Sequence, residues 1–195
     1  MKQILLLCVA CVLYASTHAQ QDFNKGLADA RAAYTAGKLD DSRFAMQQML
    51  QELDIITGKE IMKVLPAKMQ DQNMNTASDN VSGSSSFVGV VVHRDYGQEN
   101  KKVDVEIISN SPMITSINAL LAMPLIGNMG DNKVIKVGGY KALVQKSSNG
   151  SSFDYDIQLP LNATLITLKA PGYTQEQVVQ MAGSLPIAQI AKIVQ

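Results

Sequence analysis

The chain of 195 residues contains 17 basic and 17 acidic side chains, so its formal net charge is zero. A balanced charge without a basic stretch argues against binding to nucleic acid or to an anionic membrane surface. Hydrophobic residues make up 46% of the chain, which allows a core that needs no disulfide or metal to hold it together.

The N-terminal segment has the pattern of a secretory signal. Lys2 supplies a basic start, residues 4–14 are apolar, and Thr17-His18-Ala19 fits the small-x-small rule for cleavage. The apolar run is about half as long as the roughly 20 residues that a membrane span needs, and the residues before Cys11 do not fit a lipidation site. We therefore expect residues 1–19 to be a signal peptide and the mature chain to be exported. The periplasm is the favoured location, an extracellular one is the alternative, and no membrane span is expected after cleavage.

Cleavage would also remove much of the reactive chemistry. Cys8 and Cys11 are the only two cysteines, and both lie in the apolar run. His93 is the one histidine after residue 19. The mature chain would therefore have no disulfide, no thiolate nucleophile and no zinc site built from cysteine and histidine.

Residues 20–69 show a helical period. The first apolar stripe comprises Phe23, Leu27, Ala30 and Tyr34. Gly37 is expected to end that helix, and Asp40 or Asp41 can cap a second one. The apolar face of the second helix comprises Met46, Met49, Leu50, Leu53 and Ile56. Gly58 is expected to end it, with a short third helix before Pro66.

The stretch AAYTAGKLDDSRFAMQQML resembles the turn of a tetratricopeptide repeat, with Tyr34, Gly37 and Leu39 in place. It departs from that family at Ser42, where a small apolar residue is usual, and at Met49. The resemblance covers one turn, whereas a solenoid needs about three stacked repeats. A single helical hairpin is therefore the favoured interpretation.

Residues 70–86, QDQNMNTASDNVSGSSS, have few apolar side chains and many Ser, Asn and Asp residues. Such a composition is typical of a loop or linker. We expect a flexible linker here, followed by an α+β domain over residues 87–195.

The period changes to two after this linker. β-Branched or alternating runs predict strands at 87–96, 102–109, 134–146, 153–159 and 163–170. Gly138-Gly139 suggests a bend within the third run, and Asn149-Gly150 is a strong hairpin signal. Ser111-Pro112 indicates the start of a helix that ends at Pro124. A capping box at Thr174 begins a helical segment that Pro186 interrupts.

The predicted fold class is α+β, with an N-terminal helical hairpin followed by a mostly antiparallel β-sheet that has helices packed on one face. The order β-β-α-β-β-β-α over residues 87–195 resembles the PsbP/Mog1-type α+β sandwich and related small exported bacterial domains. That resemblance implies an accessory or binding role rather than an enzymatic one.

His93-Arg94-Asp95-Tyr96 is the densest group of reactive side chains. His93 and Asp95 would share one face of a strand and could act as an acid–base pair, but polar residues are also usual where a strand ends. The paired carboxylates Asp104/Glu106 and Asp154/Asp156 alternate with apolar residues, which favours a solvated sheet face over a glycosidase site. A serine hydrolase would have to use His93 without a G-x-S-x-G motif. No catalytic residue is therefore assigned, and a hydrolase is the third interpretation.

The sequence predicts no cofactor and no metal site. GNMGDN at 127–132 is rich in oxygen atoms but has one carboxylate and no EF-hand spacing. A tight loop explains it better, and no nucleotide-binding motif is present.

The segment 112–130 has more apolar residues than one helix face can bury. The candidate contact residues are Met113, Ile117, Leu121, Met123, Leu125, Ile126 and Met129. They could bind a partner protein together with the helical hairpin, or line a pocket in which the protein carries a small hydrophobic ligand between sheet and helices. The alternative is a helix end that is simply buried in the fold.

Overall fold

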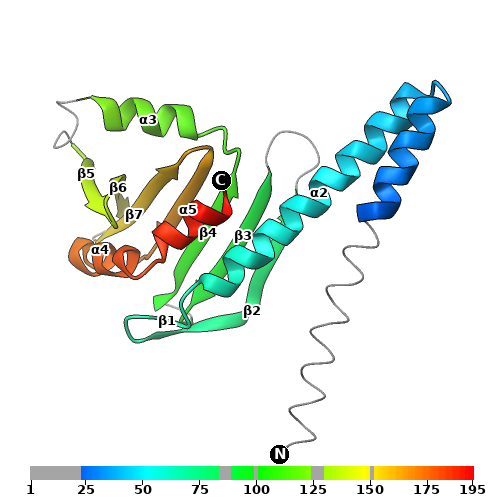
Figure 1. Ribbon diagram of the computed structural model, residues 1–195. Coiled ribbons are helices and arrows are strands. Elements are labelled where there is room, and N and C mark those ends of the chain that lie inside the picture. The colour runs from blue at the N-terminus through cyan, green and yellow to red at the C-terminus, as the bar shows by residue number, and fades with distance from the viewer. Residues whose placement is uncertain (1–22, 84–88, 99–100, 124–129, 150–151) are drawn as a thin grey trace, which may run out of the picture. The chain divides into compact units, whose positions relative to one another are not determined.

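The structure is a computed structural model that describes residues 23–83, 89–98, 101–123, 130–149 and 152–195 (Figure 1). The chain divides into two compact units, Met1–Leu53 and Asp54–Gln195. We call them the hairpin unit and the sheet unit. Helix α2, Leu39–Val64, belongs partly to each, so its two parts are described separately. The predicted signal peptide, residues 1–19, lies outside the described residues.

The hairpin unit contains a helix over residues 23–35 and the first part of α2. Gly37, with φ of 72°, ends the first helix in the left-handed conformation that glycine adopts most easily. The Lys38 amide donates to the Ala33 carbonyl at 2.9 Å, as expected at such a helix end. The predicted helical hairpin is confirmed.

Gly58 does not end the second helix, contrary to the prediction. α2 continues to Val64, and its last turns pack on the sheet. A Cβ atom at Gly58 would overlap the side chains of Val81 and Val90. The glycine is therefore a point of close helix–strand approach rather than a helix stop.

The sheet unit is built on an eight-stranded sheet of order β1-β2-β3-β4-β8-β7-β6-β5. Every neighbouring pair is antiparallel, and the predicted α+β class is confirmed. The strands are β1 Lys68–Met69, β2 Gln72–Gly83, β3 Val90–Tyr96, β4 Val103–Ser109, β5 Asn132–Val137, β6 Tyr140–Asn149, β7 Ser152–Leu161 and β8 Thr164–Lys169. Its further helices are α3 Ile114–Ala122, α4 Gln175–Gly183 and α5 Ile187–Ile193.

The predicted linker over residues 70–86 is wrong for most of its length, because β2 occupies Gln72–Gly83. β2 pairs with β3 from Met74↔Tyr96 to Gly83↔Val90, with a register irregularity between Asn75 and Asn80. Only the short β1 lies beyond it, so β2 is close to the edge of the sheet and most of its side chains are exposed or half-buried. A strand in that position can be polar, which is why its composition resembled a loop. Residues 84–86 lie outside the described residues.

The predicted third strand is two strands. β5 and β6 form a hairpin in which Val137 pairs with Tyr140. Gly138 and Gly139 are its two turn residues, with φ of 59° and 89°, and two positive φ values are what a type I′ hairpin turn requires. The predicted hairpin at Asn149-Gly150 is confirmed by pairing of β6 with β7 out to Asn149↔Ser152.

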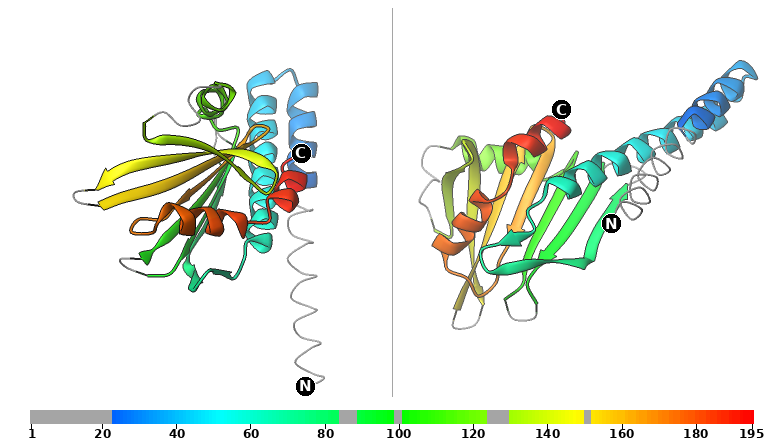
Figure 2. Two further views of the ribbon diagram at one scale, coloured as in Figure 1. Left: turned by 90° about the vertical axis from the view of Figure 1, so that its left-hand side faces the viewer. Right: turned by 60° about the horizontal axis from the view of Figure 1, so that its bottom comes forward.

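Helices pack on both faces of the sheet. The main core contains alternate residues of β4 (Val103, Val105 and Ile107) together with residues of α4, α5 and the end of α2. A smaller core on the opposite face joins Ile117 and Leu121 of α3 to Leu143 and Leu165. Figure 2 shows α3 and α4 on opposite sides of the strands. The expectation of helices on one face therefore holds for α4, α5 and the end of α2, whereas α3 lies on the other face.

The C-terminal helices begin as predicted. The Thr174 side chain accepts from the Gln177 amide, and the Gln177 side chain accepts in return from the Thr174 amide, which completes the capping box. Pro186 stands at the N-terminus of α5. Both helices then place apolar residues in the main core.

Candidate functional sites

The predicted contact segment divides between buried and exposed positions. Ile117 and Leu121 are buried in the smaller core, whereas Met113 and Met123, at the two ends of α3, are 49% and 51% exposed. Leu125, Ile126 and Met129 lie outside the described residues. The two buried residues therefore hold α3 on the sheet, and a binding role for the remainder stays a prediction.

The interior of the helical hairpin is made of small residues. Ala30, Ser42 and Ala45 are its buried positions among the described residues. The Ser42 hydroxyl donates to the Ala30 carbonyl at 2.9 Å across the hairpin. Gly26 lies so close to Met49 that a Cβ atom there would be 2.8 Å from the methionine Cγ. These contacts let the two helices pack closely, with the half-buried Met49 side chain lying against Gly26.

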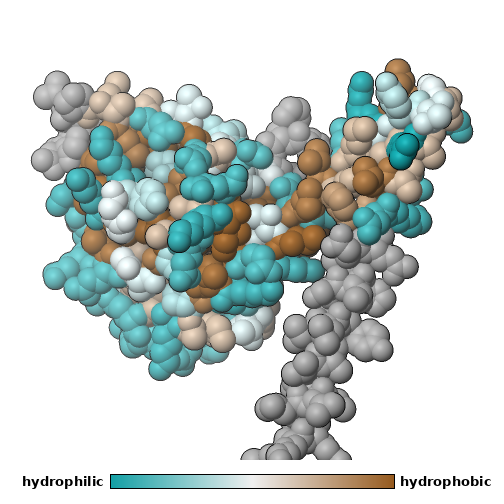
Figure 3. Space-filling model, viewed as in Figure 1, coloured by the Kyte–Doolittle hydropathy of each residue, from teal (hydrophilic) through white to brown (hydrophobic). Residues whose placement is uncertain are grey.

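Large apolar side chains of the hairpin unit face outward instead. Six of them are 51–66% exposed: Leu27, Tyr34, Leu39, Phe44, Met46 and Leu50. We call this set the hairpin apolar surface. Figure 3 shows brown hydrophobic residues among teal polar ones on this part of the chain. The predicted stripe on the first helix is thus only partly buried, since Ala30 is covered while Leu27 and Tyr34 are exposed.

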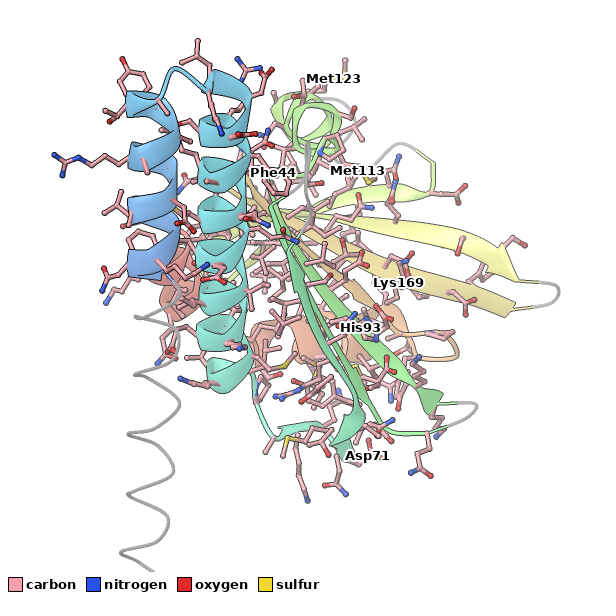
Figure 4. All side chains as sticks on the ribbon, turned by 90° about the vertical axis from the view of Figure 1, so that its right-hand side faces the viewer. Phe44, Asp71, His93, Met113, Met123 and Lys169 are labelled. Atoms are coloured by element: carbon pink, nitrogen blue, oxygen red, sulfur yellow. The ribbon has the colours of Figure 1, made fainter. Side chains whose placement is uncertain are left out.

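The sheet face that carries α3 also carries a group of polar side chains, which we call the polar face. Strand register places them in two rows across β3, β4, β8 and β7. One row is Asp95, Asp104, Lys169 and Asp156, and the other is His93, Glu106, Thr167 and Gln158. Figure 4 shows His93 and Lys169 on this face. The predicted carboxylate pairs are all partly exposed, as their alternation indicated.

His93, Asp95 and Asp104 form the tightest part of the polar face. His93 Nε2 lies 3.3 Å from Asp95 Oδ1, and His93 Nδ1 lies 3.5 Å from Asp104 Oδ2. Lys102 Nζ contacts the other oxygen of Asp95, Oδ2, at 2.9 Å. The hydrogen bond to Asp95 raises the pKa of Lys102. The sequence predicted that His93 and Asp95 share a face; it did not predict that Asp104 joins them from the next strand.

The rest of the polar face is partly shielded from water. Thr167 and Gln158 are buried, and Gln158 Oε1 has no hydrogen-bond partner among the described residues. Burial raises the pKa of Asp156, Lys169 opposes that rise, and the negative charges of Asp154 and Asp104 add to it. The Asp156 carboxylate is therefore close to other acidic side chains as well as to a lysine.

Arg94 lies on the opposite face from His93, as predicted. Its Nε donates to Asp79 Oδ1 at 2.8 Å and its Nη2 to Asp79 Oδ2 at 2.6 Å, while Nη1 donates to the Leu65 carbonyl at 3.4 Å. The hydrogen bonds to Asp79 are the main reason that the pKa of Arg94 is raised. This buried pair joins β2, β3 and the segment after α2, so its role is structural.

Three surface hollows can be described, and none matches a closed pocket for an apolar ligand. One of about 670 Å³ is lined by residues 24–36 of the first helix and its end. One of about 430 Å³ is formed by residues 71–76 and 97–98, most of them polar. One of about 160 Å³ lies where the start of α4 meets β5, β6 and β7, below the roughly 300 Å³ of an ordinary ligand site.

No protein-family profile, curated protein or solved structure matches this chain. Among the helices of the described residues, none has the length and apolarity that crossing a membrane would require.

Proposed function

We propose that this protein is an exported, non-catalytic accessory protein that binds a partner protein through the hairpin apolar surface. The observation that supports this proposal is the arrangement of side chains in the hairpin unit. Small residues occupy its interior, and six large apolar side chains are more than half exposed within residues 27–50. Scattered exposed apolar residues are ordinary, but a concentration of them on one short element is typical of an interaction surface.

The chemistry of this surface indicates the kind of partner. Charged residues of both signs stand among the apolar ones, such as the exposed pair Lys25–Asp29 at 3.4 Å. The surface therefore offers little net charge to attract a charged ligand. A complementary apolar groove or helix face on another protein would bury Leu39, Met46 and Leu50, which share one side of α2, in the way that amphipathic helices are usually recognised.

The carrier function remains the alternative, without support from the three hollows described above. A hydrolase likewise has no support beyond the polar face, whose nearest acid–base pair is His93 and Asp95.

Export and cleavage after Ala19 are part of the proposal. N-terminal sequencing of the protein recovered from the native host should begin at Gln20, and a retained residue 1 in the exported fraction would contradict that part.

The test compares two triple variants of the full chain. L39A/M46A/L50A reduces the hairpin apolar surface with a residue that favours helix, and M74A/Y140A/F153A is the matched control at three exposed apolar positions of the sheet unit. A partner captured by the wild type from the native host is identified, purified and titrated against each form. We expect the hairpin variant to weaken the dissociation constant at least about tenfold, and the control variant to bind as the wild type does.

Equal binding by the wild type and the hairpin variant would refute the proposal, as would the failure of any purified candidate to bind. Sedimentation of each form distinguishes a second copy of this chain: a dimer that the hairpin variant dissociates would replace the partner protein. Native mass spectrometry covers the carrier alternative, because a bound small molecule at one per chain would favour it instead.

A further inference from the structure

We propose that His93, Asp95 and Asp104 bind a divalent metal ion, with zinc as the preferred ion. This site lies in the sheet unit, and the inference does not depend on the proposed partner. It also departs from the expectation, drawn from sequence, of no metal site.

The topology brings the three side chains to one point. His93 and Asp95 are two residues apart on β3, so both side chains project from the same face. Asp104 on β4 pairs directly with Asp95. Two carboxylates directly opposite each other on neighbouring strands repel. Lys102 contacts Asp95 from one side, and an ion would add a positive charge between the two carboxylates and His93.

The distances suit a single ion. One ligand atom from each of the three residues can be chosen so that all lie within 4.8 Å of one another. Ligands about 2.1 Å from a tetrahedral zinc are about 3.4 Å apart, close to the 3.3 Å between His93 Nε2 and Asp95 Oδ1. Asp104 supplies the third ligand of the proposed set, and its Oδ2 lies 3.5 Å from His93 Nδ1.

A buried carboxylate oxygen without a hydrogen bond is directed toward His93. The Asp95 side chain is 6% exposed, and its Oδ1 atom is buried without a hydrogen-bond partner among the described residues. Its other oxygen already contacts Lys102. Oδ1 faces His93, so it is directed into the proposed site. Buried carboxylate oxygens are almost always hydrogen-bonded, and an ion that contacts both Oδ1 and His93 Nε2 would satisfy this one.

Charge and access also fit a cation. Around the site, the polar face contributes five carboxylates (Asp95, Asp104, Glu106, Asp154 and Asp156), and Lys102 and Lys169 contribute two ammonium groups. Five negative and two positive charges leave −3 with a neutral histidine, and one divalent ion offsets most of that charge. The side chains of His93 and Asp104 are 26% and 27% exposed, so an ion can reach them from solvent.

The donor atoms favour zinc over magnesium or calcium. Calcium takes six to eight oxygen ligands and magnesium is held mostly by oxygen and water, whereas an imidazole nitrogen with carboxylates suits zinc and its neighbours in the first transition row. Three protein ligands leave at least one position for water or for a donor from another molecule.

Calorimetric titration of the purified, EDTA-treated full chain with zinc chloride tests the site. We expect saturable binding of one ion per chain with a dissociation constant below about 10 µM. His93→Gln and Asp104→Asn, both at partly exposed side chains, should each weaken binding at least about tenfold. Asp71→Asn makes the same change of charge at the β1–β2 turn, away from the site, and should bind as the wild type does.

Circular dichroism of each variant checks that the fold is kept, and the visible absorption of cobalt(II) bound in place of zinc should change on loss of the His93 nitrogen. Absence of saturable binding by the wild type would overturn the proposal, because His93 would then simply lie between two carboxylates. Equal zinc affinity in the wild type, His93→Gln and Asp104→Asn would also overturn it. Tighter binding of calcium than of zinc would contradict the choice of metal.

Discussion

Replacing Asp79 by alanine should destabilise the sheet unit, because it would leave the guanidinium of Arg94 buried without its counter-charge. The Arg94 side chain is 8% exposed and makes two short hydrogen bonds to Asp79, at 2.6 and 2.8 Å. After the substitution, the 3.4 Å hydrogen bond to the Leu65 carbonyl and the nearby neutral Tyr96 hydroxyl would remain. Since neither carries a negative charge, the variant must either unfold more readily or admit water to Arg94.

The expected magnitude follows from the burial of the two partners. Breaking a buried ion pair by removing one member typically costs about 3–5 kcal/mol. Asp79 is 21% exposed, so water can partly take its place and the lower end, about 3 kcal/mol, is expected. For a unit of this size that corresponds to a fall of about 10 °C in the melting temperature. Arg94 stays charged at every accessible pH, so the loss should not depend on pH between about 6 and 9.

Urea unfolding followed by circular dichroism measures this loss, with Glu60→Ala as the control. Glu60 belongs to an exposed ion pair with Lys63 on α2, at 2.6 Å, whose removal should cost less than about 0.5 kcal/mol. Arg94→Met and the double variant D79A/R94M complete a thermodynamic cycle, and the double variant should be no less stable than Asp79→Ala alone. A loss below about 1 kcal/mol for Asp79→Ala, or additive losses in the double variant, would refute the reasoning.

Two further substitutions in the sheet unit test its packing. Burial raises the pKa of Tyr96 to about 12, against the lowering effect of the neighbouring Arg94, and its buried hydroxyl makes no hydrogen bond of good geometry to a described residue. Tyr96→Phe should therefore leave the unfolding free energy at pH 7 unchanged or slightly higher. Between pH 10 and 12 the unfolded wild type loses this proton first, so wild-type stability should fall relative to the variant by roughly 2–3 kcal/mol; parallel pH profiles of unfolding would contradict this. Gly58→Ala should cost about 1–3 kcal/mol despite its better helix propensity, because the new methyl group would overlap Val81 and Val90. The control is Gly183→Ala at the end of α4, where no atom lies within 4 Å of the added Cβ, and it should be neutral or stabilising by up to about 1 kcal/mol. Equal melting temperatures of the Gly58→Ala and Gly183→Ala variants would show that the packing at Gly58 is not tight.

Much of the sheet could be predicted because its strands have one face in the main core. In β4, for example, buried Val103, Val105 and Ile107 alternate with half-buried Asp104, Glu106 and Ile108, so a period of two is visible in the sequence. β2 contributes little to the core and has no such period. Its polar residues matched loop composition, and the burial of the Arg94–Asp79 pair could not be predicted without knowing that β2 lies beside β3.

The helical hairpin shows a different limit of sequence patterns. A helical period identifies which residues share a side, but it does not say which side is covered. The prediction gave weight to large residues such as Leu27 and Tyr34, whereas the contact between the helices uses Ala30, Ser42 and Ala45. Small residues allow closer approach, so the larger apolar side chains are left outside.

The metal site depends on register, which sequence determines only when the turn length is known. Tyr96 pairs with Val103, so the connection between β3 and β4 is six residues long and Asp104 lies opposite Asp95. A connection one residue shorter or longer would turn every side chain of β4 to the other face and would set Val103 or Val105, instead of Asp104, opposite Asp95. The valines of β4 must face the main core, which excludes a shift by one residue, and the length of the connection selects the register that brings the two carboxylates together. The repulsion between Asp95 and Asp104 is therefore a consequence of burying β4 correctly, and a bound cation would offset it without any change in the core.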